Sequence, residues 1–155
     1  MASPAIYPLD IKLENTDTGT SKDHAHNLKI IITNKADTAF SFLLMSCSWN
    51  SCISFKPEII YRDYEGCPKN IAQAISLKPN ESYTLSGRFK ISDSTLNNSL
   101  PVTVGFRVVL PGDEHWATTS DLIIKSMEHD LSRLAYDPKY STKDYTWSEP
   151  VAIRF

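Results

Sequence analysis

Apolar and polar side chains alternate with a period of two in one segment after another of this 155-residue chain. In the clearest row, Val102, Val104 and Phe106 are separated by a threonine and a glycine. Successive side chains of a β-strand point to opposite faces, so this rhythm predicts strands with one buried face and one wet face. The expected strands cover residues 6–14, 28–33, 40–45, 83–91, 102–110 and 150–155, with a weaker strand at 53–61 and an edge segment at 71–77.

Turn-forming residues separate these rows. Lys78-Pro79-Asn80-Glu81 combines a proline that fixes φ with an asparagine that tolerates unusual backbone angles. About seven short strands divided by such turns predict an all-β fold, an immunoglobulin-like sandwich of two antiparallel sheets. The length and the lack of a repeat or linker predict a single domain over residues 1–155.

One stretch before the last strand departs from the two-residue rhythm. In residues 120–135, Ile124, Met127, Leu131 and Leu134 recur at helical spacing, after a possible N-cap at Thr119 or Ser120. This spacing predicts a short helix inside an insertion at about residues 113–147. A strand at 122–127 followed by a loop is the alternative, because short apolar runs fit both patterns.

Charge and hydropathy exclude two classes of partner. The 16 basic and 18 acidic residues are spread along the chain, so no basic block is present to follow a phosphate backbone. The longest apolar runs, residues 30–32 and 42–45, are far shorter than the ~20 residues of a transmembrane helix. We therefore expect neither nucleic-acid binding nor a transmembrane segment.

Three local motifs have a family likeness: residues 43–49 (LLMSCSW), 77–82 (LKPNES) and 145–151 (YTWSEPV). Together they resemble uncharacterised immunoglobulin-like domains of exported bacterial proteins. The resemblance implies a sandwich fold and an extracytoplasmic location, periplasmic, secreted or surface-anchored, and it brings no known activity. The first residues lack the basic and apolar regions of an export signal, so we expect that signal to lie outside this sequence, although a cytoplasmic protein would begin in the same way.

The chain has three cysteines, Cys47, Cys52 and Cys67. In an exported domain this odd number allows one intrachain disulfide and one further thiol. We expect Cys47 to pair with Cys67, because Cys47 follows a strand and Cys67 lies in a loop that can fold back over it. Pairing of Cys52 with Cys67 and three reduced cysteines are the alternatives.

Soft metal ligands gather in the same region. Met45, Cys47 and Cys67, together with Cys52 and the histidines His24 and His26, are suitable ligands for copper or zinc. The spacing argues against a metal centre, because no Cys-x-x-Cys pair occurs and a His-x-His in a polar loop is usually solvated. A copper- or zinc-handling protein therefore stays a secondary hypothesis, and no cofactor is expected.

The remaining candidates are aromatic residues near loops and strand ends. Trp116, Tyr136 and Tyr140 fall within the expected insertion, where flat rings can stack on sugars or anchor a protein. Trp49 and Trp147 are expected instead to cap the ends of the core. With no Gly-x-Ser-x-Gly elbow and no glycine-rich phosphate loop, the sequence predicts a protein that is not an enzyme but a binding or structural module for an unknown protein or glycan, with a carbohydrate-binding module as the alternative.

Overall fold

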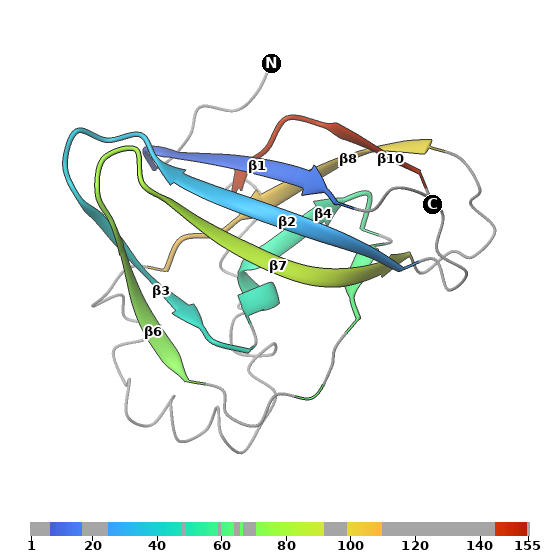
Figure 1. Cartoon of the computed structure of the whole chain (residues 1–155), viewed down its shortest axis with the longest axis horizontal. Coiled ribbons are helices and arrows are strands. Elements are labelled where there is room, and N and C mark those ends of the chain that lie inside the picture. Colours follow the sequence, from blue (N-terminus) through green and yellow to red (C-terminus); the bar gives the residue numbers. More distant parts are fainter. Residues whose placement is uncertain are drawn as a thin grey trace.

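The computed structural model describes residues 7–16, 25–47, 49–58, 60–63, 66, 71–91, 99–109 and 145–154. These residues form ten strands and one short 3-10 helix (Figure 1). The elements are β1 (Leu9–Asn15), β2 (Ala25–Asn34), β3 (Phe40–Met45), η1 (Trp49–Cys52), β4 (Ile53–Lys56), β5 (Ile60–Arg62), β6 (Ala72–Leu77), β7 (Ser82–Ile91), β8 (Ser99–Phe106), β9 (Thr146–Trp147) and β10 (Val151–Arg154).

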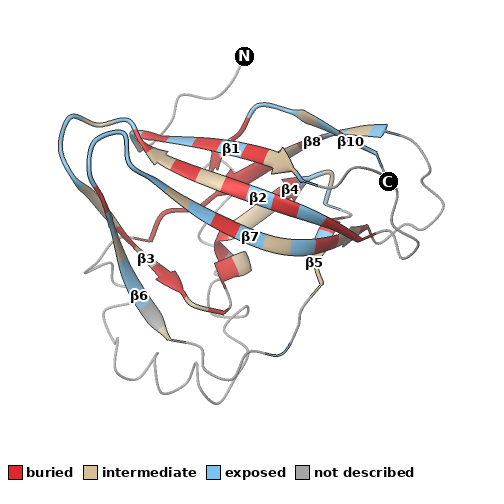
Figure 2. Ribbon diagram, viewed as in Figure 1, coloured by how far each residue is buried: buried red, intermediate tan, exposed pale blue. Residues whose placement is uncertain are grey.

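The first sheet has the strand order β1-β2-β7-β5, and all its pairs are antiparallel. Its alternating pattern is clearest in β2, where Leu28, Ile30 and Ile32 are buried and Lys29 between them is exposed. Figure 2 shows the same alternation of buried and exposed residues along β1 and β7. One face of this sheet therefore covers the core and the other faces solvent.

The second sheet has the order β10-β8-β4, with β9 also paired to β8. Val102, Val104 and Phe106 of β8 are fully buried, as their spacing predicts. Aromatic contacts join this sheet to the first, because Phe55 of β4 and Phe89 of β7 meet edge to face with 5.1 Å between ring centroids. The fold is thus sandwich-like, with its core between the two sheets.

A third, two-stranded sheet pairs β3 with β6 and extends away from the larger sheets (Figure 1). It continues the β2–β7 pair, because one turn links β2 to β3 and another links β6 to β7. The fully buried Asn34 holds the two turns together. Its Nδ2 donates to Thr38 O at 2.9 Å and to Leu77 O at 3.0 Å, and its Oδ1 accepts from Ala36 N at 2.9 Å.

The expected antiparallel all-β fold is confirmed, but the single strand expected at residues 53–61 is wrong. β4 pairs with β8 and β5 pairs with β7, so this stretch crosses from one sheet to the other. Pro57 lies at the crossing, where its missing N–H and fixed φ end the β4 ladder. The helix expected at residues 120–135 lies outside the described residues.

Within the described ranges, no helix has both the length and the apolar character that a membrane crossing requires.

Candidate functional site

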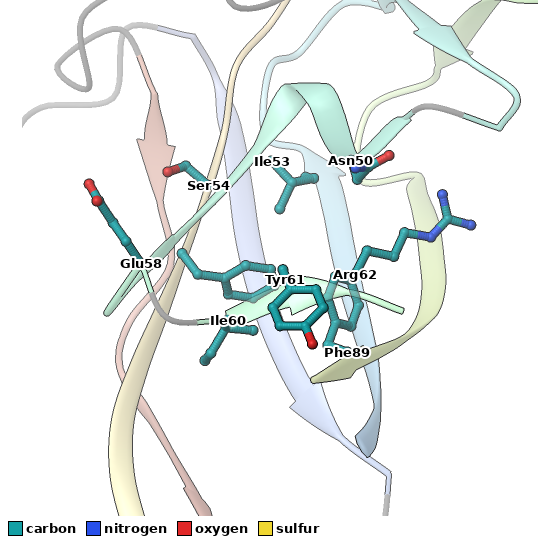
Figure 3. Close-up of a pocket in the computed structure, with 9 residues that line it drawn as sticks. Asn50, Ile53, Ser54, Glu58, Ile60, Tyr61, Arg62 and Phe89 are labelled. Carbon is teal, nitrogen blue, oxygen red and sulfur yellow. The ribbon is translucent and has the colours of Figure 1, made fainter. Parts of the chain in front are cut away.

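A pocket of about 450 Å³ opens on the side of the sandwich where the two larger sheets end in β4 and β5 (Figure 3). Its volume lies within the ~300–1,000 Å³ range of ligand-binding clefts. The described lining comes from η1, from β4 and the turn after it, from β5 and from β7: Asn50, Ile53, Ser54, Phe55, Glu58, Ile60, Tyr61, Arg62 and Phe89. We call this cavity the β4–β5 pocket.

The pocket is open because its two walls are sheet edges. In the described part of the chain, β4 pairs with β8 alone and β5 with β7 alone. Both strands are short, with four and three residues. No further strand bridges the two sheets on this side among the described residues, so the interior is reached between β4 and β5.

The floor of the β4–β5 pocket is apolar. Phe55 and Ile60 are each 6% exposed, and Phe89 is 1% exposed. All three belong to the main hydrophobic cluster, and Ile53 packs against that cluster while its side chain points into the pocket (Figure 3). A ligand group that reaches this floor would therefore contact the core of the domain itself.

The rim of the pocket is polar and carries both charges. Figure 3 shows Glu58 on one side and Arg62 with Asn50 on the other. Tyr61 lies between them and is 50% exposed, which makes it the one large exposed hydrophobic residue in the described part of the chain. A half-exposed phenol above an apolar floor is suited to a ligand with an apolar group and polar ends.

Arg62 is held in place by two contacts. Its guanidinium lies 4.3 Å from the ring centroid of Trp49, and its Nη1 donates a hydrogen bond to Cys47 O. Trp49 itself is buried and packs on Gly87, where an added Cβ would lie 3.1 Å from the indole. These contacts fix the cationic side of the pocket before a ligand arrives.

Next to the pocket, a small ion-pair group joins Asp63, which follows β5, to two residues of β7. The carboxylate of Asp63 lies 3.6 Å from Arg88 Nε and 3.4 Å from Lys90 Nζ. The described lining of the pocket contains one carboxylate, Glu58, and neither histidine nor cysteine. These charged and polar groups can bind and orient a ligand.

The described lining of this pocket includes none of the cysteines, histidines and tryptophans singled out from the sequence. Cys67, Trp116, Tyr136, Tyr140 and His24 lie outside the described residues. The structure therefore places no part of the expected aromatic binding surface.

Of the expected metal ligands, Met45 and Cys47 are both buried near the end of β3. Cys52 is a buried thiol of the hydrophobic cluster. The described residues contain no group of three or more His, Cys, Asp or Glu side chains that could hold a metal ion.

Two expectations about single residues need correction. His26 is not a solvated loop residue: β2 begins at Ala25, so His26 pairs with Phe89 and is 1% exposed. Trp147 does not cap the core, because its ring lies over Gly105 on the outer face of β8, covered by Lys56 with Nζ 4.0 Å from the ring centroid. Trp49, by contrast, does pack in the core.

Sequence reasoning missed the pocket residues Glu58 and Arg62. The available signal was the proline inside the weak row at 53–61, which marks a chain crossing between two sheets and therefore an open edge.

Comparison with protein-family models, with curated proteins and with solved structures finds no match to this chain.

Proposed function

We propose that this chain is a non-catalytic, immunoglobulin-like binding domain that acts outside the cytoplasm and holds its ligand in the β4–β5 pocket. The observation that carries the proposal is an apolar floor beneath a polar rim, in a pocket that opens between the edge strands β4 and β5 of the two sheets. Clefts of this kind, with a few polar groups around apolar walls, are the usual form of a ligand site.

The strand order supports the immunoglobulin-like part of the proposal. When the β3–β6 pair and the two-residue β9 are set aside, seven strands remain, with orders β1-β2-β7-β5 and β10-β8-β4. Lettered A to G along the chain, these orders are A-B-E-D and G-F-C, the arrangement of a constant-type immunoglobulin domain. In this lettering the pocket lies between the edge strands C and D.

A disulfide between Cys47 and Cys67 belongs to the same proposal, because such bonds persist outside the cytoplasm. Ser46 N donates to Ile71 O at 2.8 Å, and Ile71 N donates to Ser46 Oγ at 3.0 Å. The chain at Ile71 is therefore beside Cys47, and Cys67 precedes Ile71 by only four residues. Cys52 is buried in the core as a thiol, which leaves Cys47 as the better partner.

The binding function is tested by filling the pocket. Ile53→Trp adds an indole where the isoleucine side chain already points into the cavity, whereas Ile53→Val keeps the cavity open and serves as the matched control. Peptide and glycan arrays are screened with the native domain, and each ligand is then titrated against both variants. The proposal expects binding that Ile53→Trp abolishes and Ile53→Val preserves.

Two results would contradict the proposal. Binding that is equal for the native domain and Ile53→Trp would place the ligand elsewhere on the molecule. The absence of binding in both arrays would remove the binding role for these two ligand classes. Glycan binding sensitive to Ile53→Trp would instead assign the pocket to a carbohydrate-binding module.

A further inference from the structure

The backbone of β4 presents hydrogen-bonding groups at the rim of the pocket. Arg107 N donates to Cys52 O at 2.9 Å, and the register pairs Ser54 with Gly105 and Lys56 with Thr103. In an antiparallel ladder, hydrogen-bonded and non-hydrogen-bonded pairs alternate. Cys52, Ser54 and Lys56 thus bond toward β8, whereas the N–H and C=O groups of Ile53 and Phe55 point toward the open edge.

The opposite wall has the same arrangement. Asp63 N donates to Arg88 O at 2.8 Å, so the alternation makes Tyr61 and Lys90 the next hydrogen-bonded pair. The N–H and C=O groups of Ile60 then point away from β7. Both edge strands of the pocket, β4 and β5, therefore present main-chain donors and acceptors beside an apolar floor.

The charge of Lys56 does not protect the open edge of β4 from pairing with another strand. Proteins commonly protect an edge strand with a charged side chain, above all lysine. Lys56 is the charged residue of β4, but its Nζ lies over the ring of Trp147 on the outer face of the sheet. Its charge is thus turned away from the pocket.

We propose that the β4–β5 pocket receives an extended peptide segment of another protein, which adds as a strand to the open edge of β4 and places one bulky apolar side chain on the floor. This inference rests on the proposed binding function and names its ligand class. Strand addition takes its affinity from main-chain hydrogen bonds and its specificity from pockets for alternate side chains. Phe55, Ile60 and Phe89 form such a pocket directly beside the outward-pointing groups of β4.

The charges on the rim set a direction for the peptide. Glu58 on one side favours a basic residue of the ligand, and the Arg62 side favours an acidic residue or a terminal carboxylate. The apolar anchor lies between these two positions. The expected ligand therefore carries opposite charges on either side of one large apolar residue.

The test uses a displayed library of random peptides of roughly ten residues, the upper end of ordinary strand length. The native domain is expected to enrich peptides with a central Leu, Ile, Phe or Trp and with opposite charges around it. Ile53→Trp should weaken the selected peptides by at least about tenfold, while Ser41→Ala on β3, outside the described lining of the pocket, should change their affinity by less than about threefold. Circular dichroism and melting curves of both variants confirm that each is folded.

Hydrogen exchange followed by nuclear magnetic resonance then separates strand addition from other modes of binding. In the free protein, the amides of Ser54 and Lys56 should be protected by β8, and those of Ile53 and Phe55 should exchange faster. On peptide binding, protection should appear at Ile53 and Phe55. This alternating gain is the signature of a new strand on β4.

Each other outcome overturns the inference in a distinguishable way. Peptides that Ile53→Trp blocks, but that do not protect Ile53 and Phe55, would refute strand addition and leave the proposed binding function standing. A library without enriched peptides would refute the peptide class, while a glycan sensitive to Ile53→Trp would still support the pocket. Concentration-dependent dimerisation that Ile53→Trp abolishes would assign the edge to a second copy of the chain.

Discussion

Replacement of Asn34 by alanine is expected to be among the most destabilising polar substitutions in the described part of the chain. The side chain is fully buried and makes three hydrogen bonds, to the backbone of Ala36, Thr38 and Leu77. Each hydrogen bond is worth about 1 kcal/mol net, and a buried group left without a partner costs about 1–3 kcal/mol. The expected loss for Asn34→Ala is therefore about 3 kcal/mol, the sum of the three hydrogen bonds.

The assay is urea and thermal unfolding followed by circular dichroism. For a domain of this size, about 3 kcal/mol corresponds to a fall in Tm of roughly 6–12 °C. Ser41→Ala is the control, because Ser41 Oγ and Ser76 Oγ form a 3.1 Å hydrogen bond that is exposed. It should change stability by less than about 0.5 kcal/mol. A loss for Asn34→Ala no larger than that of the control would refute the role of Asn34 as the link between the two turns.

Three further predictions concern other parts of the domain. Gly105→Ala should lower the free energy of unfolding by about 1–3 kcal/mol and alter indole fluorescence, because the new Cβ would lie 2.9 Å from the ring of Trp147. Unchanged unfolding and fluorescence would contradict the packing of Trp147 on Gly105. Asn80 has a φ of 63°, in the left-handed region. Asn80→Ala should therefore lower the free energy of unfolding in urea by roughly 1–2 kcal/mol, whereas Asn80→Gly should leave it nearly unchanged. Equal effects of the two substitutions would contradict the left-handed turn. If Cys47 and Cys67 are bonded, reductant should lower stability by about 3 kcal/mol, and alkylation of unfolded, unreduced protein should label Cys52 alone; three labelled thiols would exclude the bond.

Much of the fold follows from local sequence because its strands alternate cleanly between turns. Phe40–Met45 was predicted with its observed bounds, and the buried row of β8 begins with the residues that the spacing picks out. β9 could not be predicted, since a two-residue strand carries no period. The start of β2 was missed because His26, although polar, is buried against its neighbours.

Local patterns in the sequence do not predict the β4–β5 pocket. Its floor combines Phe55 with Phe89, residues that lie on different sheets and meet only after the chain has crossed between them at Pro57. The same holds for Arg62, whose guanidinium contacts Trp49 and Cys47 O, both far from it in the sequence. A site assembled from three-dimensional neighbours leaves only an indirect mark on the sequence, here a proline within a weak apolar row.

The most direct test of the binding account is a map of intermolecular nuclear Overhauser contacts in a complex of the domain with a selected peptide. The account predicts contacts from one apolar peptide side chain to the rings of Phe55 and Phe89 and to the methyl groups of Ile60. Contacts confined to other surfaces, with these three side chains unperturbed, would contradict it.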